Sequence, residues 1–553
     1  MLALSAVFLW LAPPQFPGGY YRRDEIVPGS EAGEAFASRC VPLSDFNGDG
    51  VVEWAVGAPG FHQAAGRVVI FDGERAKPVR EHRGTHPGSA FGSSIALIPD
   101  FDGDGQADYA VAAPGLTSEV AGEVFFFSGA ESRLLARYSD QRPGGRFGQT
   151  LFLPGDWDGD GREDLGVAAP GWVSGERQGG RVQIFGLPDF RILEQKLGRH
   201  PGDGFGHAVA VLPPGDSNRE VILAIGSPLA RFEGQTPGAV FFWHRGQTGT
   251  LKRIVGEHPG EAFGSWLSLS PDWDGDGQGD WLIGACQAPG VAGPGCGALR
   301  LFSSGDGRLL FRMEGERPGE AMPSWVELVP DRDGDGLAEF AVGVENAGGP
   351  PRPRRGQLRI YGSLDGRVLH RLDGGHKESG FGASFGFAPA SPSSASSWFW
   401  IGAPGDRLQQ DGAATGSLQR WRLAPGMQSS GSSLSGKRGG QVRFDLDFGP
   451  ESGGQPFQVF CSQELGHSPW RGILLPLRQD ALFDACAAGR WPEFAYDWHG
   501  KLSPEGMAQV QLFLPPNGFP KALRDRLLWL SAAAGWQSDH PRASLPVPFF
   551  VEP

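Results

Sequence analysis

Hydrophobic and polar positions alternate in short runs along residues 20–423, and the runs return at a nearly constant distance. Seven units open with an apolar residue in a glycine-rich segment, most often PGxxFG; these heads are Phe36, Phe91, Phe147, Phe205, Phe263, Met322 and Phe381, spaced 55 to 59 residues apart. An alternating run such as SSIALIP (93–99) follows each head and is typical of a half-buried β-strand. The chain is therefore built from seven copies of one unit.

Each unit predicts four strands. After the first run, most units have an Asp/Gly loop and a second apolar run that ends in GAPG, AAPG or a variant. The third run has Gly, then Val or Leu two residues on, then an aromatic residue five residues on; it begins at Gly66, Gly122, Gly180, Gly238, Gly297, Gly356 and Gly416. A less regular run closes the unit. Four short strands repeated seven times indicate an all-β fold, a seven-bladed β-propeller.

The two ends of the array predict how the ring closes. The seventh unit runs through its third strand at Trp421 and then enters a Gly/Ser-rich segment that provides no fourth strand. Residues before the first head have the pattern of a fourth strand. We therefore expect residues near Tyr20–Ile26 to supply the outer strand of the seventh blade.

Five units carry the loop D-x-[DN]-x-D-G-x-x-[DE] between the first and second strands. Positions 1, 3 and 5 direct side-chain oxygens inward, Gly at position 6 permits a sharp turn, and position 7 offers its backbone carbonyl. Oxygen-only ligands with many carboxylates in a flexible loop favour Ca²⁺ over Mg²⁺. The predicted ligands are Asp45, Asn47, Asp49, Val51, Glu53; Asp100, Asp102, Asp104, Gln106, Asp108; Asp156, Asp158, Asp160, Arg162, Asp164; Asp272, Asp274, Asp276, Gln278, Asp280; Asp331, Asp333, Asp335, Leu337 and Glu339.

An EF-hand would need Glu at position 12 and flanking helices, whereas position 12 here is aliphatic and lies in a predicted strand. We expect about five structural calcium sites that join the first strand to the second. The fourth and seventh units have DSNRE (216–220) and SPSSASS (391–397) instead, and we expect no ion there.

The net charge of −14 is explained by these loops. Their ligand positions hold 19 acidic side chains, so the remainder of the chain carries a net charge of +5. The acidity therefore marks metal sites rather than an acidic binding surface. It also disfavours nucleic acid as a partner.

The F-G heads, the DxDGDGxxD loops and the GAP segments together resemble the FG-GAP repeats of the integrin α-subunit propeller, which also occur in secreted bacterial proteins. The resemblance covers residues 20 to about 423; it departs at Met322-Pro323 and in the loops of the fourth and seventh units. It implies that position 9 binds the ion directly. It also implies that the face opposite the calcium loops binds an extracellular protein or polysaccharide.

The loop PPRPRR (350–355) lies between a second and a third strand, and such loops belong to the expected ligand face. It places Arg352, Arg354 and Arg355 there. Two interpretations stay open, a contact for an anionic ligand and a solvated loop.

The ends of the chain differ from the repeats. Residues 1–18 begin with the apolar run MLALSAVFLWLA and are expected to be a signal peptide, the alternative being a first core strand. No apolar stretch reaches 18 residues, so no transmembrane helix is predicted. Residues 424–440 are a Gly/Ser-rich linker, and 441–553 suit a small C-terminal β-sandwich, in which RDRLLWLSAAA (524–534) reads as either helix or strand.

The five cysteines fit a secreted protein. We expect disulfides between Cys286 and Cys296 and between Cys461 and Cys486, and a buried Cys40. The sequence shows no catalytic constellation outside the calcium loops. The leading hypothesis is a secreted or surface-exposed binding or adhesion propeller, not an enzyme; an extracellular polysaccharide lyase or hydrolase is the alternative. A structural envelope component is a third hypothesis.

Overall fold

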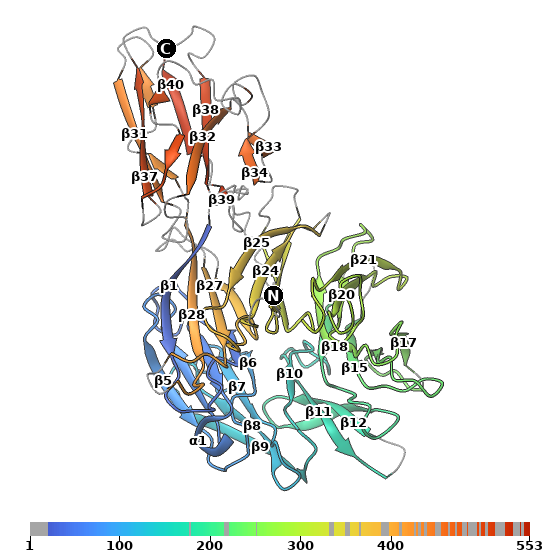
Figure 1. Cartoon of the computed structure of the whole chain (residues 1–553). Helices are drawn as coiled ribbons and strands as arrows, with labels where there is room; N and C mark the ends of the chain where they lie inside the picture. Colours follow the sequence, from blue (N-terminus) through green and yellow to red (C-terminus); the bar gives the residue numbers. More distant parts are fainter. Residues whose placement is uncertain are drawn as a thin grey trace.

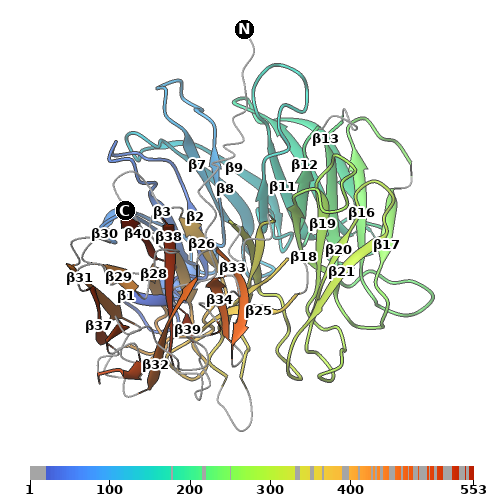
Figure 2. The same ribbon diagram turned by 90° about the horizontal axis from the view of Figure 1, so that it is seen from above.

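The computed structural model describes residues 20–175, 179–214, 220–249, 251–330, 337–348, 354–363, 366–388, 398–408 and 412–424, and separate strands and short segments between 427 and 552. The expected signal peptide, residues 1–18, lies outside the described residues. Strands β1–β28 form seven four-stranded antiparallel sheets arranged around a ring (Figures 1 and 2). The predicted seven-bladed propeller is confirmed.

Each blade uses four strands that are consecutive in the sequence, except the last. The first is β2 (Arg39–Pro42), β3 (Trp54–Ala58), β4 (Arg67–Phe71) and β5 (Pro78–Arg83). The second is β6 (Ser94–Ile98), β7 (Asp108–Ala113), β8 (Ala121–Phe127) and β9 (Leu134–Pro143). The third is β10 (Thr150–Phe152), β11 (Leu165–Val173), β12 (Gly179–Gly186) and β13 (Arg191–Leu197).

The remaining blades follow the same order. The fourth is β14 (Val209–Leu212), β15 (Ile222–Ser227), β16 (Ala239–His244) and β17 (Lys252–Val255). The fifth is β18 (Phe263–Ser270), β19 (Asp280–Ala285), β20 (Ala298–Phe302) and β21 (Leu309–Glu314). The sixth is β22 (Trp325–Val329), β23 (Glu339–Val344), β24 (Gln357–Tyr361) and β25 (Val368–Asp373).

The seventh blade joins the two ends of the array. It contains β26 (Phe385–Ala388), β27 (Trp398–Ala403) and β28 (Ser417–Ala424), and β1 (Tyr20–Pro28) pairs antiparallel with β28 as the outer strand. This confirms that the N-terminal strand closes the ring. The short element α1 (Phe61–Ala64) is a turn in the loop after β3, because His62 and Gln63 have positive φ.

The glycine that opens a third strand and the head of the next unit form the joint between neighbouring blades. Gly66 lies beside Phe91 in a parallel bridge, and Gly297 lies beside Met322 in the same way. Gly66 has φ of +85°, and a Cβ at this position would lie 2.2 Å from the Phe91 carbonyl oxygen. Only glycine fits there. Met322 is fully buried, so it occupies the place of the usual phenylalanine.

Among the described residues of the propeller, seven clusters of buried side chains form the core, and each is shared by two neighbouring blades. The cluster between the first and last blades contains Trp54 and Trp400, whose ring centroids lie 6.4 Å apart. Burying one large apolar side chain contributes about 1.5–3 kcal/mol. Cys40 is 2% exposed within this cluster, which confirms its predicted core position, and burial raises the pKa of its thiol to about 12.

The C-terminal strands form three further sheets, which lie beyond the propeller in Figure 1. One sheet has the order β29-β31-β37-β35, one has β30-β40-β38-β32-β36 with β39 beside β38, and one is the pair β33-β34. Their bounds are β29 (Met427–Ser429), β30 (Ser433–Ser435), β31 (Gly440–Asp447), β32 (Pro456–Ser462), β33 (Leu465–Trp470), β34 (Ile473–Leu477), β35 (Ala495–Tyr496), β36 (His499–Lys501), β37 (Met507–Leu514), β38 (Arg526–Ala534), β39 (Arg542–Ala543) and β40 (Val547–Glu552).

Two expectations for this region can be compared with these strands. Most of the segment RDRLLWLSAAA is strand β38, and the expected linker 424–440 contributes the short strands β29 and β30. The two-layer β-sandwich itself stays a prediction.

Candidate metal centres

The acidic loops lie at one end of their blades, between the first and second strands. In the second blade β6 ends at Ile98 and β7 begins at Asp108, so the carboxylate at position 9 is the first residue of the second strand. Asp280 and Glu339 begin β19 and β23 in the same way. All three carboxylates have 0% exposure. The sheet therefore fixes position 9, and the turn carries positions 1 to 7.

The loop of the second blade shows how the motif shapes its turn. Asp100 accepts the backbone N–H groups of Gly103 and Gly105 on its two carboxylate oxygens, at 2.6 and 2.8 Å. These glycines have φ of +82° and +92°, values that other residues rarely adopt. The same contacts recur around Asp156 and Asp272. Asp at position 1 and the two glycines thus set the shape of the loop.

The carboxylate at position 9 connects the loop to the neighbouring strands. Asp108 accepts the Phe101 N–H at 2.7 Å and the N–H of Gly129, two residues after β8, at 2.8 Å. Burial raises the pKa of Asp108 despite these bonds, and the nearby Asp102 carboxylate adds to the rise. In the third blade burial raises the pKa of Asp164 to about 6. A bound cation would relieve both burial and repulsion in such a turn.

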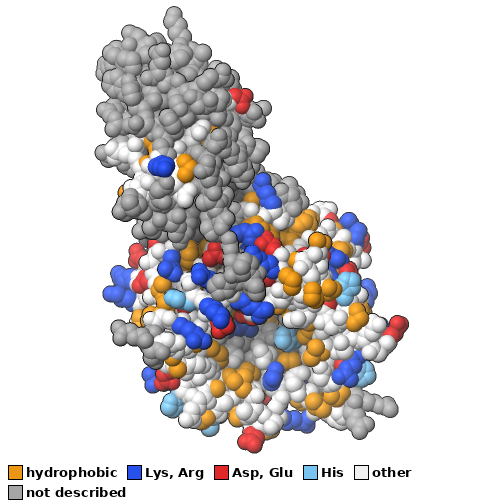
Figure 3. Space-filling view, viewed as in Figure 1, with side chains coloured by type: hydrophobic (Ala, Val, Ile, Leu, Met, Phe, Trp, Pro, Cys, Tyr) orange, Lys and Arg blue, Asp and Glu red, His pale blue; other side chains and the backbone are white. Residues whose placement is uncertain are grey.

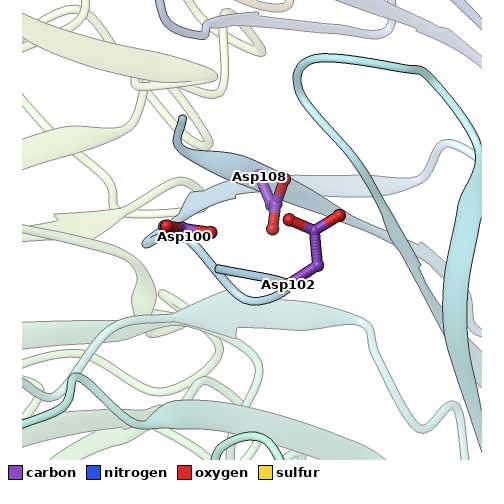
Figure 4. A group of neighbouring side chains, drawn as sticks. All are labelled: Asp100, Asp102 and Asp108. Carbon is purple, nitrogen blue, oxygen red and sulfur yellow. The ribbon is translucent and has the colours of Figure 1, made fainter. Parts of the chain in front are cut away.

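Of the acidic loops that the structure describes, three bring carboxylates together closely enough to share one ion. In each, three carboxylate oxygens lie within 4.8 Å of one another; the groups are Asp100, Asp102 and Asp108, Asp156, Asp158 and Asp164, and Asp272, Asp274 and Asp276. Figure 4 shows the first group, with two side chains on the turn and Asp108 on the strand.

The donor chemistry of these groups fits a calcium ion. All the side-chain donors are carboxylate oxygens, the ligands that hard cations prefer. Asp274 gives the clearest sign, because its Oδ1 is buried and accepts no hydrogen bond from the residues that the structure describes. Burying a charged oxygen without a hydrogen-bond donor costs free energy, and a bound cation would offset this cost.

The other predicted loops are described only in part or lack one carboxylate. In the first blade Asn47 occupies position 3, and its amide donates to Glu53 Oε1 at 2.6 Å. In the sixth blade Asp331, Asp333 and Asp335 fall in 331–336, outside the described residues. The segments 215–219 and 391–397, which cover most or all of the loops where no ion is expected, also lie outside them. Ligation by the position-7 carbonyl stays a prediction.

Three arginines beside the loops were missed by the sequence reasoning. Arg133, Arg191 and Arg308 lie at the start of the fourth strand of their blades and donate to the position-3 carboxylates of Asp102, Asp158 and Asp274, at 3.1, 2.8 and 3.3 Å. Each arginine side chain is more than half exposed, so the pair itself contributes little to stability. The repeated Arg before the fourth strand was the available signal.

The predicted disulfide between Cys286 and Cys296 is wrong, because both cysteines are free. The register of β19 and β20 pairs Ala285 with Ala298. The ladder ends there, because the Gly297 N–H donates to the Ala288 carbonyl oxygen rather than to residue 286. The Cys296 Sγ donates to the same carbonyl oxygen at 3.6 Å, whereas the Cys286 N–H donates to Ser265 Oγ at 3.2 Å. Cys296 is fully buried, whereas Cys286 is partly exposed. The second predicted pair, Cys461 and Cys486, involves side chains outside the described part of the chain.

The loops between second and third strands lie at the opposite end of the blades from the acidic loops. These loops, together with the last residue of β11, carry four of the large apolar side chains that are at least half exposed: Leu116 (55%), Val173 (50%), Leu229 (54%) and Val291 (102%). An open groove of about 600 Å³ lies between the third and fourth blades, lined by Val173, Gly175, His200, Pro201 and Arg231. Arg354 and Arg355 are exposed on the equivalent loop of the sixth blade, and Arg352 lies outside the described residues.

Comparison with known proteins agrees with this architecture. The FG-GAP repeat family model matches residues 91–127, which span the second blade from its head to its third strand. The chain is 31% identical over 155 residues to integrin alpha-4 of Xenopus laevis, and 28% identical over 212 residues to integrin alpha-V of Gallus gallus. These matches cover 26% and 35% of this chain, but only 15% and 20% of the relatives.

A relative of another kind is phosphatidylinositol-glycan-specific phospholipase D of Mus musculus. It is 32% identical over 163 residues, which cover 26% of this chain and 19% of that protein. The chain thus spans a fifth or less of the length of each of these relatives.

Proposed function

Because this chain is an FG-GAP β-propeller of the integrin α type, we propose that it is a ligand-binding or adhesion module whose blades are held by calcium ions. The observation that carries the proposal is the recurrence of one acidic turn at the same end of successive blades. Three such turns converge their carboxylates, and one leaves a buried oxygen without a donor.

The ions would act on structure rather than on a substrate. Positions 1, 3, 5 and 9 supply carboxylates, apart from Asn47 at position 3 of the first loop, and position 9 is the first residue of the second strand in the second, fifth and sixth blades. A calcium ion bound there neutralises charges that repel one another and joins the first strand to the second. Binding to the folded chain alone stabilises it by about 1–3 kcal/mol per site at ten to a hundred times the Kd.

The ligand would bind on the opposite face, among the loops between second and third strands. Exposed apolar side chains on neighbouring loops are typical of an interaction surface. Leu116, Val173, Leu229 and Val291 are such side chains on four successive blades, and the groove beside Arg231 and His200 adds polar contacts. We expect a protein or polysaccharide ligand there.

We place this module outside the cell, secreted or at a surface. Its resemblance to integrin α propellers and the apolar segment 1–18 support that location. Among the described residues, no helix combines the length and apolar character that a membrane span requires.

An extracellular lyase or hydrolase is the second candidate, supported by the phospholipase D among the relatives. An array of immobilised glycans and extracellular proteins, probed in calcium and in EGTA, tests the proposal when it is combined with a polysaccharide-cleavage assay. Calcium-dependent binding without cleavage is expected. Cleavage of a polysaccharide would favour the enzyme instead.

A further inference from the structure

The first strands of the blades line the axis of the ring, and residues at the starts of these strands make contacts between blades there. Arg39 begins β2 in the first blade, and its Nε donates to the carbonyl oxygen of Ser93, which precedes β6 in the second. The Arg39 guanidinium also lies 4.8 Å from the ring centroid of Trp325, in β22 of the sixth blade. These two contacts join the first blade to the second and to the sixth.

The third blade adds a cationic arginine to this region, and the fourth blade adds a titratable histidine. Arg146 precedes the head of the third blade, and His207 lies two residues after the head of the fourth. Thr150 of β10 donates to the His207 carbonyl oxygen at 3.0 Å, which joins the two first strands. Burial, followed by the charges of Arg146 and Arg39, lowers the pKa of His207. The space-filling view shows a hollow at the middle of the ring with Lys, Arg and His side chains beside it (Figure 3).

Arg39 differs from the other buried arginines of the propeller. Those are Arg67, Arg181, Arg300 and Arg359, and each pairs with a carboxylate, namely Glu34, Asp140, Glu261 and Glu320. Arg39 is partly buried, yet within the described part of the chain no carboxylate lies within 4.0 Å of its guanidinium. Because buried charges are normally paired, an anion from outside the chain would complete this site.

Two carboxyl groups of the sixth blade lie on residues that contact Trp325 or its neighbour Ser324. Glu327, two residues along β22, accepts the Trp325 indole N–H at 3.1 Å, and burial raises the pKa of its carboxyl to about 7. Glu345 follows β23, and burial raises the pKa of its carboxyl too. A single carboxylate suits the planar fork of one arginine.

We propose that Arg39, with Arg146 and His207 beside it, binds a carboxylate in the central channel, supplied by an acidic side chain of a protein ligand. The site opens on the proposed ligand face, because Arg39, Arg146 and His207 lie at the starts of first strands, away from the calcium loops. A protein side chain is favoured over an acidic sugar because Arg39 already covers a face of Trp325 on which a sugar ring would stack.

This inference rests on the proposed binding function and names the chemistry of its ligand. The test is titration calorimetry of the full chain in calcium, with a short peptide containing one Glu and its twin containing Gln. We expect the Glu peptide to bind at least about ten-fold more tightly, and Arg39→Gln to abolish that preference, as loss of a charge-assisted hydrogen bond implies. Arg83→Gln, an exposed arginine on the outer strand β5, is the matched control and should bind as the unaltered chain does.

A second variant tests the site without the risk that weaker binding comes from a folding defect. Arg146→Gln changes an exposed side chain at the rim and should weaken the Glu peptide by a smaller factor, with an unchanged melting temperature. Equal binding of the two peptides, or full binding by a folded Arg39→Gln, would overturn the proposal. Tighter binding of trigalacturonate than of the Glu peptide would overturn the assignment to a protein side chain. Calcium-dependent binding on the array that survives Arg39→Gln would overturn this inference alone and leave the proposed function intact.

Discussion

The buried pair of Glu261 and Arg300 is expected to be a main electrostatic support of the connection that enters the fifth blade, because Glu261 precedes the head of this blade and Arg300 lies in its strand β20. Arg300 donates to both carboxylate oxygens of Glu261, at 2.9 and 2.8 Å, and both side chains are at most 1% exposed. Removing one partner of such a pair typically costs about 3–5 kcal/mol, because the other charge stays buried. Glu257, 3.6 Å from Arg300, offsets part of that cost. We therefore expect Glu261→Gln to lower the free energy of unfolding by about 3 kcal/mol.

Urea denaturation in calcium, followed by tryptophan fluorescence, measures this free energy. The double variant Glu261→Gln with Arg300→Met should be more stable than Glu261→Gln alone, because it removes the unpaired charge as well. Lys377→Gln, in a pair whose side chains are 70% and 58% exposed, is the matched control and should change stability by less than about 1 kcal/mol. The reasoning would be refuted by a Glu261→Gln effect as small as that of the control.

Three further predictions concern a calcium-binding carboxylate, a buried histidine and the two cysteine thiols of the fifth blade. Asp164→Asn should remove about 1–3 kcal/mol of the stability that calcium provides, and it should change the stability in EGTA little. Asp189→Asn, on an exposed turn of the same blade, should leave the stability unchanged both in calcium and in EGTA. Burial lowers the pKa of His82 to about 4, so the unfolded chain takes up the proton first and stability should fall from pH 6.5 towards pH 4, by up to about 1.4 kcal/mol per pH unit; a His82→Gln variant that kept this slope would argue against it. Cys286 should react with a thiol reagent in the native chain before the buried Cys296, and peptide mapping that found the two joined would contradict the free thiols of the structure.

Features that recur in every unit could be predicted from the sequence alone. The spacing of heads and third-strand glycines follows from one joint, since Gly66 admits only a hydrogen where it meets Phe91. Ring closure was predictable too, because the missing fourth strand at one end matched a spare strand at the other. The acidic turns were readable because Asp and Gly at fixed positions determine their shape.

Features that depend on register or on the closed ring could not be predicted. Spacing alone placed Cys286 and Cys296 at the ends of one loop, but only the folded loop shows that they bond different neighbours, Ser265 and Ala288. Arg39 and Trp325 are 286 positions apart in the sequence and meet only because the seven blades close. Neither residue belongs to the repeated motif, so comparing the seven units with one another does not reveal it.

Calcium removal is the measurement that tests the account most directly. Metal analysis of the purified chain should find about five calcium ions, and EGTA should lower the melting temperature by roughly 5–15 °C, from about 1–3 kcal/mol per site in a propeller of this size. Added calcium should restore the melting temperature, and magnesium should restore less of it. A melting temperature that is the same in calcium and in EGTA would contradict the calcium-stabilised propeller.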